Sequence, residues 1–342
     1  MGTVSLKSIA REVGVAPSTV SRVLRNDARC YVSKAKKEAI LQAARTQEYI
    51  PHAAARSLVL KRSFNIAFVL CDFSKLEESG PFTPKMVEGV HQVLTPAGYV
   101  LSFVTIPQRD PAALERVCSA TRTYDGLIFP LGTVDEQAAG VLADSSMPFV
   151  IAGDNSSHLR SFARVFTDKN GGFSRVIGHL KELGHTDIAF LGQIRSALDM
   201  FFDGCREHSL TVRPESIRLF ESRNYYELQM AAYLAAQPLL TGPHTAVVCS
   251  NDFTALGLCQ RLRDAGLEPG KDMSVTGFDD VEELLDVPEE NRFLTTVHKP
   301  REEMGEAAAR LLLEKIADPG ITAREEQLPC RLVVRTSTGR KP

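Results

Sequence analysis

The sequence lacks the cysteine patterns of disulfide-stapled and zinc-binding proteins. Its seven cysteines are odd in number, widely spaced along 342 residues and include no C-x-x-C pair. Neither a disulfide framework nor a zinc site is therefore encoded. We expect reduced thiols, and no metal ion or other cofactor.

Long hydrophobic runs are missing as well. The chain begins Met-Gly-Thr-Val-Ser-Leu-Lys-Ser, without the apolar segment of a signal peptide. Nowhere does an apolar stretch approach the roughly 20 residues that cross a bilayer. We expect a cytoplasmic protein with no membrane partner.

The whole chain also lacks a large net charge, since its formal total is −2. The total conceals an uneven distribution. Residues 1–62 hold twelve Lys or Arg and four Asp or Glu, a balance of +8, whereas residues 63–342 hold 28 and 38, a balance of −10. This asymmetry predicts a small anion-binding head on an acidic body.

The first 24 residues predict two short helices joined by a tight turn. Ser5 can cap a helix that begins at residue 6, and Gly14 stands where a chain leaves a helix through positive φ. Pro17 suits the first turn of the second helix. With Ala10 at the helix contact and Val20 packing back, the spacing fits a helix-turn-helix, although a chance helical hairpin is the alternative.

The exposed positions of the second helix suit a nucleic-acid surface. They are Pro17, Ser18, Thr19, Ser21, Arg22 and Arg25. All but the proline can donate hydrogen bonds to phosphates or base edges. By contrast, the lysines at positions 34, 36 and 37 are typical of a helix face exposed to solvent.

A third helix is expected after Ser33, its cap, and before Pro51, which disfavours helical geometry at the preceding residue. Its buried stripe is expected to contain Ala35, Ala39, Ile40, Ala43 and Ala44. Residues 52–59 have high helix propensity but are too few to form a helix alone. We expect this segment to order only when it docks.

The order and spacing of residues between positions 9 and 58 resemble those of the DNA-binding head of the LacI/GalR family of bacterial transcription repressors. The matching segments are residues 9–10, 14–15, 19–24, 49–51 and 54–58. The resemblance implies that the second helix enters the major groove of an operator and that a hinge helix ending in Leu58 wedges into the minor groove. It implies DNA-binding roles for Ser5, Pro17, Ser18, Thr19, Ser21, Arg22, Tyr31, Ala55 and Leu58.

The head departs from the family pattern at two places. Ala16 stands where the family has a capping serine, and the loop 26–32, which contains Tyr31, is longer than in the lactose repressor. Pro17 is restricted to apolar contacts such as a thymine methyl. Arg22 is therefore the principal candidate for guanine recognition.

From residue 63 short β-branched or aromatic runs alternate with amphipathic stretches. Strands are predicted at 64–70, 99–105, 126–130, 149–152, 188–192, 245–250 and 273–277, and helices at 84–97, 111–122, 135–144, 171–183, 226–240 and 254–265. Such alternation implies parallel sheets covered on both faces. We predict an α/β fold in which a small all-α helix-turn-helix head precedes two Rossmann-like subdomains with a cleft between them.

The body resembles the effector domain of the same family, which is similar to periplasmic sugar-binding proteins. The resemblance lies in residues 168–172, 250–257, 277–280, 294–297 and 332–338. It implies three crossings between subdomains, so that ligand closure can alter the geometry of the DNA heads. It gives a helix-turn-helix domain at 1–51, a hinge helix and linker at 52–62, and an effector-binding and dimerisation domain at 63–342. The N-subdomain comprises about 63–164 and 295–324, and the C-subdomain about 165–294 and 325–342.

The resemblance also places an effector site in the cleft. It contains Phe82, Asp154, Phe201, Tyr225, Asn251, Asp279 and Lys299. An aromatic face can stack a sugar or base, and carboxylates accept hydrogen bonds from hydroxyls. The alternative is purely structural, because aspartates at strand ends often cap helices and a lone phenylalanine usually belongs to a core.

Phe201 stands where many sugar-responsive members have an arginine. Loss of that guanidinium disfavours a ligand rich in hydroxyls or phosphates and favours an apolar or aromatic one, unless Lys299, Arg301 or Tyr225 compensates. We therefore expect an effector that is not recognised in the usual pentose or hexose manner.

The sequence thus predicts a transcription regulator, a repressor controlled by a small effector such as a sugar, nucleoside or related metabolite. No heptad extension follows residue 338, so we expect a homodimer, a pseudo-palindromic operator and association with the nucleoid. An enzyme and a cytoplasmic binding protein are the alternatives. The usual phosphate-loop, dinucleotide, metalloprotease and nucleophile-elbow motifs are missing, and the basic head favours a regulator that is not an enzyme.

Overall fold

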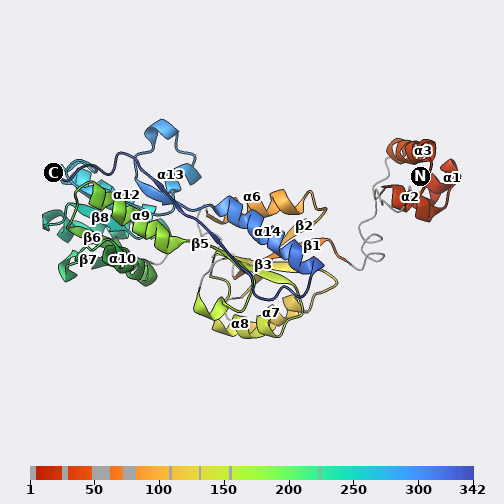
Figure 1. Cartoon of the computed structure of the whole chain (residues 1–342), viewed down its shortest axis with the longest axis horizontal. Helices are drawn as coiled ribbons and strands as arrows, with labels where there is room; N and C mark the ends of the chain where they lie inside the picture. The colour runs from red at the N-terminus through yellow and green to blue at the C-terminus, as the bar shows by residue number, and fades with distance from the viewer. Residues whose placement is uncertain are drawn as a thin grey trace. The chain divides into compact units, whose positions relative to one another are not determined.

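The computed structural model describes residues 5–24, 30–47, 62–71, 82–107, 110–130, 132–153, 156–222 and 225–342, apart from the side chains of Cys71, Tyr225 and Tyr226. The chain divides into two compact units, Met1–Ser63 and Phe64–Pro342 (Figure 1). In the described parts, no helix is both long and apolar enough to cross a membrane.

The N-terminal unit contains three helices, α1 (Leu6–Val13), α2 (Pro17–Leu24) and α3 (Lys34–Thr46). The predicted helix starts are confirmed, because Ser5 and Ser8 form a reciprocal capping box and Ser33 accepts a hydrogen bond from the N–H of Lys36. Gly14 ends α1 with φ 66°, which is left-handed geometry that glycine adopts without strain.

The core of the head is built around Ile9, Val20 and Ile40, whose side chains are fully buried. The predicted stripe of α3 is partly wrong, because Ala35 and Ala39 are exposed. The two helices that cover α3 have eight residues each. They reach its second half, where Ile40, Ala43 and Ala44 are buried, and leave its first turns in solvent.

The first lobe of the larger unit is built around a six-stranded sheet, in which the strands follow the order β11-β5-β4-β3-β1-β2. All its strand pairs are parallel. The strands are β1 (Asn65–Cys71), β2 (Val100–Ile106), β3 (Gly126–Pro130), β4 (Phe149–Ala152), β5 (Arg164–Thr167) and β11 (Glu325–Leu328). Helices α6 (Phe82–Leu94) and α14 (Arg301–Ala317) cover one face, and α7 (Pro111–Cys118) and α8 (Glu136–Ala143) cover the other. Side chains of β1 alternate between the two cores, as expected for a sheet buried on both faces.

The second lobe is a four-stranded parallel sheet in the order β7-β6-β8-β9. Its strands are β6 (Ile188–Gly192), β7 (Ile217–Leu219), β8 (Ala246–Cys249) and β9 (Ser274–Thr276). Helices α9 (Lys169–Glu182) and α10 (Arg195–Glu207) pack on one face, and α11 (Tyr225–Ala235) and α12 (Asp252–Asp264) on the other. The short helices are α13 (Val281–Leu284), η1 (Ser157–Leu159), η2 (Pro214–Ser216), η3 (Gln237–Thr241) and η4 (Glu289–Asn291).

The chain passes between the lobes after β5, after β10 (Thr296–His298) and after β11. Strand β12 (Arg331–Val333) pairs antiparallel with β10 beside α9 of the second lobe. The structure therefore divides the two lobes at different residues from those predicted. Hydrogen bonds assign β5 and β11 to the first sheet rather than the second lobe, and Val297 of β10 lies in the core of the second lobe.

Candidate DNA-binding surface and effector site

Helix α2 presents a polar face opposite its buried one. Val20 and Val23 hold the helix against the rest of the head, whereas Pro17, Ser18 and Arg22 are exposed. Ser18 and Arg22 are four residues apart, so they lie on the same face of the helix. This face has the donors that base edges and phosphates require.

The remaining predicted DNA contacts are distributed around the head. Thr19 and Ser21 of α2 are half-buried. Ser5 uses its hydroxyl as the cap of α1, accepting from the N–H of Ser8 at 3.3 Å. Tyr31 is 98% exposed, an unusual position for an aromatic ring without a partner surface. Ala55 and Leu58 lie outside the described residues.

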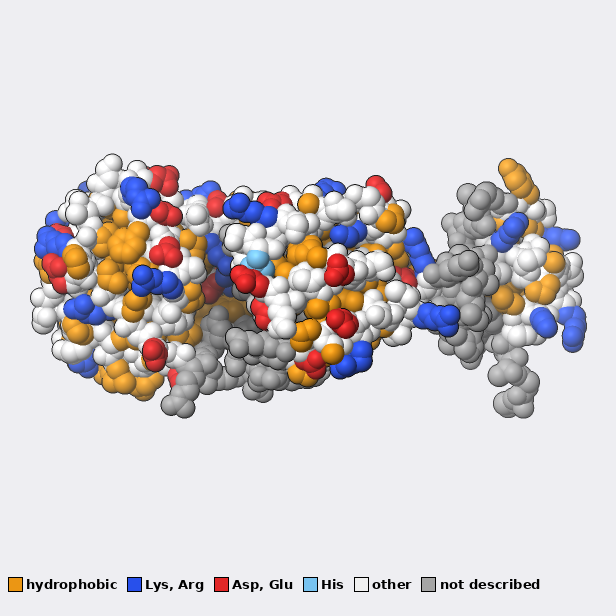
Figure 2. Space-filling model, turned by 90° about the horizontal axis from the view of Figure 1, so that it is seen from below, with side chains coloured by type: hydrophobic (Ala, Val, Ile, Leu, Met, Phe, Trp, Pro, Cys, Tyr) orange, Lys and Arg blue, Asp and Glu red, His pale blue; other side chains and the backbone are white. Residues whose placement is uncertain are grey.

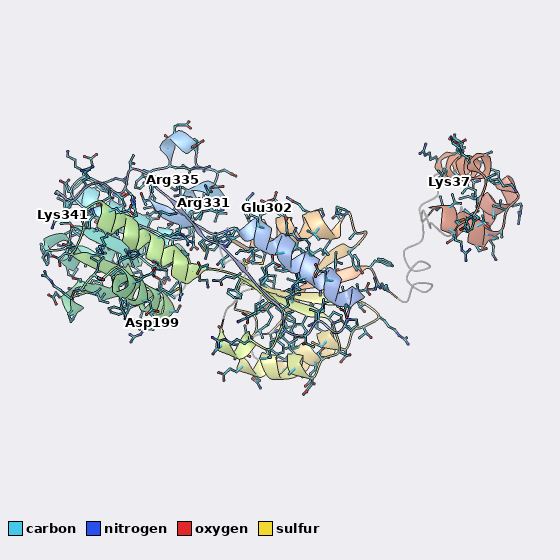
Figure 3. The ribbon with its side chains drawn as sticks, viewed as in Figure 1. Lys37, Asp199, Glu302, Arg331, Arg335 and Lys341 are labelled. Carbon is cyan, nitrogen blue, oxygen red and sulfur yellow. The ribbon has the colours of Figure 1, made fainter. Side chains whose placement is uncertain are left out.

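The charge of the head is visible on its surface. The charged side chains that can be seen on it in Figure 2 are basic, in agreement with the excess of Lys and Arg in residues 1–62. Lys37 of α3, labelled in Figure 3, is an exposed basic residue of the head. A basic surface of this kind attracts the phosphate backbone of DNA.

In the larger unit, a buried ion cluster joins the two lobes. Asp279 follows β9 of the second lobe, and its Oδ1 is 2.5 Å from Lys299 Nζ and 2.8 Å from Arg301 Nη2. Arg301, the first residue of α14 in the first lobe, also donates to the backbone carbonyl of Asp279 at 2.9 Å. The structure thus brings two predicted site residues, Asp279 and Lys299, into direct contact.

The predicted aromatic residue meets the same cluster. Phe82 begins α6, and the guanidinium carbon of Arg301 lies 4.0 Å from the centre of its ring. Lys299 Nζ lies 5.9 Å from that centre and 5.6 Å from the centre of the Phe278 ring. Both cations are therefore held over aromatic faces, an attractive arrangement in a partly dry site.

Asn251 follows β8, which is the neighbour in the sheet of strand β9, the strand that precedes Asp279. Its Oδ1 caps α12 by accepting from the N–H of Thr254 at 2.9 Å and from the hydroxyl of that residue at 3.0 Å. The next residue, Asp252, donates its N–H to the carbonyl of Phe278 at 3.0 Å, so the backbone that follows Asn251 is tied to the residue before Asp279. Asn251 Nδ2 is buried and has no hydrogen-bond partner among the described residues.

Asp252 holds the loop that carries Asp279. It is almost fully buried and accepts from the N–H of Val281 at 2.6 Å and from the hydroxyl of Thr296 at 2.5 Å. Burial raises the pKa of Asp252 to about 7, and the hydrogen bond from Thr296 opposes the shift. The sequence prediction did not include this residue, whose place in the Ser-Asn-Asp segment beside Asn251 was the available signal.

The electrostatics of the cluster also affect Lys299. Burial lowers the pKa of Lys299 to about 8, and Arg301 acts in the same direction, while the carboxylate of Asp279 opposes both. A lysine whose pKa is lowered in this way stays mainly charged at neutral pH but is sensitive to any further charge brought beside it.

The prediction that Phe201 contacts the effector is wrong. Residues 195–207 form helix α10, and Phe201 lies on its inner face with no exposed surface. Its ring packs 5.3 Å from that of Phe190, centre to centre, in the core between α10 and the sheet. An apolar residue on the inner face of a helix is a core residue, whatever family position it occupies.

Two other predicted contacts cannot be placed. Asp154 and the side chain of Tyr225 lie outside the described residues. Arg301, by contrast, entered the prediction only as a substitute for the missing arginine, yet it makes more contacts with Asp279 than Lys299 does. Its position two residues after Lys299 was the only signal in the sequence.

A second charged cluster lies next to the first. Asp280, Glu283 and His298 place possible metal-ligand atoms within 4.8 Å of one another. However, Arg335, labelled in Figure 3, donates to Asp280 at 2.7 Å, and hydrogen bonds from His298 and Arg335 lower the pKa of Asp280 against the effect of its burial. A metal ion would have to compete with that guanidinium, so the cluster is better explained as an ion-pair network.

Two family models match the chain. The model of bacterial regulatory proteins of the lacI family matches residues 5–52, and the model of the periplasmic binding protein-like domain matches residues 177–338. The first match covers the head, and the second covers most of the second lobe together with α14.

Known proteins match over nearly the whole length. The HTH-type transcriptional repressor PurR of Vibrio cholerae is 30% identical over 332 residues, which are 92% of this chain and 92% of that protein. The lac repressor dimer bound to operator and the anti-inducer ONPF has a TM-score of 0.74 at 22% identity and covers 99% of this chain and 100% of that one. The complex of the regulator CelR with cellobiose has a TM-score of 0.67 at 23% identity and covers 98% and 99%. These structures share the helix-turn-helix head and the two-lobed fold.

Proposed function

The chain belongs to the lacI family of bacterial regulatory proteins, and from this premise we propose that it is a repressor whose homodimer binds a pseudo-palindromic operator through α2. A small molecule bound between the two lobes controls its affinity for that operator. As in the family, it is a sequence-specific DNA-binding transcription regulator.

The observation that carries the proposal is the exposed polar face of α2 on a basic head. Ser18 and Arg22 are directed away from the core that Val20 and Val23 form. A helix displayed in this way fits the major groove, where its first turns reach base edges. Two heads related by two-fold symmetry would read two symmetrical half-sites.

Dimerisation is supported by apolar side chains left exposed on the larger unit. Val100 and Phe103 on the edge strand β2 are 64% and 51% exposed, and Met230 and Leu234 on α11 are 62% and 67% exposed. Apolar side chains gathered on an edge strand and on one helix are typical of protein interfaces. We propose that these surfaces pair with their equivalents in a second copy.

Effector control is supported by the ion cluster at the lobe junction. Arg301 and Phe82 of the first lobe meet Asp279 of the second at this point. A ligand that binds these groups changes the relative stability of open and closed lobe arrangements, and only such a difference can alter operator affinity. The lac repressor and CelR structures were both obtained with small molecules.

We propose further that the protein catalyses no reaction and works in the cytoplasm, on the nucleoid when bound to DNA. The relatives that match over nearly the whole chain are transcriptional repressors. They support a regulator and not an enzyme, although the two doubly wound lobes by themselves are compatible with either. The basic head supports a DNA partner over a simple binding protein.

Selection of bound sequences from a random DNA pool tests the proposal. The full chain should enrich a two-fold symmetric site, and a chain lacking residues 1–62 should enrich none while it keeps its thermal stability. Enrichment of an asymmetric site, or of none by the full chain, would contradict the proposed function.

A further inference from the structure

At the lobe junction, two described cationic side chains contact a single carboxylate. Lys299 and Arg301 share one carboxylate, that of Asp279, and both approach the same oxygen atom. The Nδ2 of Asn251 adds a buried donor that has no acceptor among the described residues. Buried polar groups in proteins are normally paired, so this site has a shortage of acceptor atoms.

The same groups carry an excess of positive charge. Two cations, 17% and 6% exposed at their side chains, face one carboxylate. The positive charge of Lys169 also acts on Lys299. A buried cation without its own counter-ion is unfavourable, and the rings of Phe82 and Phe278 compensate for only part of that loss.

The other described acids of this region are already engaged, and among them Asp252 accepts from the N–H of Val281 and from the hydroxyl of Thr296. Asp168 caps α9 by accepting from the N–H of Gly171 at 2.9 Å, and its second oxygen lies 3.8 Å from Arg175. Its charge is thus already opposed by a cation on its own helix. Asp280 is likewise engaged by Arg335 and His298.

We propose that the effector is an acid, whose carboxylate or phosphate group is bound by Lys299 and Arg301 while Asn251 donates a hydrogen bond to its polar remainder. The inference rests on the proposed function, because it names the chemical class of the molecule bound between the lobes. The anionic group supplies the acceptors and the negative charge that the described residues lack, and charge-assisted hydrogen bonds to guanidinium and ammonium are the strong ones.

Matched pairs of small molecules test this class directly. The thermal midpoint of the full chain is measured with ribose and ribose 5-phosphate, and with glucose and gluconate, at equal concentration and ionic strength. At least one acid should raise the midpoint, and titration should show that it binds about tenfold or more tightly than its neutral counterpart. The phosphate and carboxylate pairs distinguish the two kinds of acid.

Variants then assign the effect to the two cations. Arg301→Gln and Lys299→Gln should each reduce the midpoint shift given by the acid, whereas Lys299→Arg, which keeps the charge, should retain most of it. Arg324→Gln, at an exposed pair with Glu314, is the matched control and should behave like the parent chain. Circular dichroism and operator binding show whether each variant is folded.

Three outcomes would overturn the inference. They are a larger shift from the neutral member of each pair, equal shifts in the parent and both Gln variants, and no shift from either acid. None of them would affect the proposed function if the full chain still selects a symmetrical operator, so the two failures are distinguishable.

Discussion

At the scale of single residues, Asp279 and Asp280 combine backbone strain with charge. Their φ angles are 121° and 56°, and two successive non-glycine residues at positive φ are costly, at about 1–3 kcal/mol each. Arg301 holds Asp279 through both its carbonyl and its carboxylate, and Arg335 holds Asp280. Strain maintained by surrounding contacts is characteristic of ligand-binding sites.

Removal of the Asp279 carboxylate, which Lys299 and Arg301 share, should destabilise the folded chain. Asp279→Ala leaves the buried Arg301 and the partly buried Lys299 together without this counter-ion, so we expect a loss of about 3 kcal/mol in the free energy of unfolding. The double variant Asp279→Ala with Arg301→Gln should lose less than the single variant, since one uncompensated cation has been removed. Urea denaturation measures both, and a double variant that loses the sum of the two single effects would show that the groups are not coupled.

The pKa of Lys299 gives a pH dependence with a definite sign. In the folded chain that pKa is lowered to about 8 from its usual 10.5, so the unfolded chain binds more protons between these values. The contribution of Lys299 to stability should therefore increase as pH rises from about 8 to about 10.5. Denaturation curves of the parent and of Lys299→Gln across this interval report the difference, and parallel curves would contradict the shift.

At the scale of helices and strands, hydrophobic pattern determined what could be predicted. Strands β3 and β6 have the predicted bounds, because each is a fully buried five-residue run. Strand β11, Glu-Glu-Gln-Leu, was missed because it is a polar sequence at a sheet edge, with Glu325 exposed, and is recognisable only through its pairing with β5. Tertiary contacts, not local pattern, form it.

The same contrast between local sequence pattern and tertiary contacts applies to the site residues. Asp279, Asn251 and Phe82 were assigned by the resemblance, whereas their positions next to predicted strands and helices also allowed a purely structural role. Phe201 was misassigned because its family position was preferred to the apolar face of α10, a helix that is absent from the predicted elements. Arg301 was underrated because its contact partners come from the other lobe.

The packing of α10 makes the corrected role of Phe201 testable. Phe201→Ala should lower the free energy of unfolding by about 3–5 kcal/mol, the usual effect of removing a buried phenylalanine. Its effect on ligand affinity should be small in the fraction that remains folded, as calorimetry would show. A large loss of affinity with little loss of stability would return Phe201 to the effector site.

Helix α2 gives the corresponding prediction for DNA. Arg22→Ala should weaken binding by about 1–3 kcal/mol and relax the preference at one symmetric base pair of the operator. Binding to the selected operator and to single-base variants measures this. An equal loss on every sequence would place Arg22 on a phosphate instead.

At the scale of the whole molecule, three chain crossings link the lobes that hold Asp279 and Arg301. Because each lobe has its own sheet and cores, the lobes can move as bodies while the junction changes its contacts. The larger unit begins at Phe64, directly after the segment that leads from the head.

The affinity of the full chain for its selected operator, measured with and without a molecule that raises its thermal midpoint, tests this account most directly. We predict a change of about 5–150-fold in the operator dissociation constant, together with an equal change in the affinity for the molecule when operator is present. An operator affinity that stays the same at saturating ligand would contradict the claim that this protein is an effector-controlled repressor.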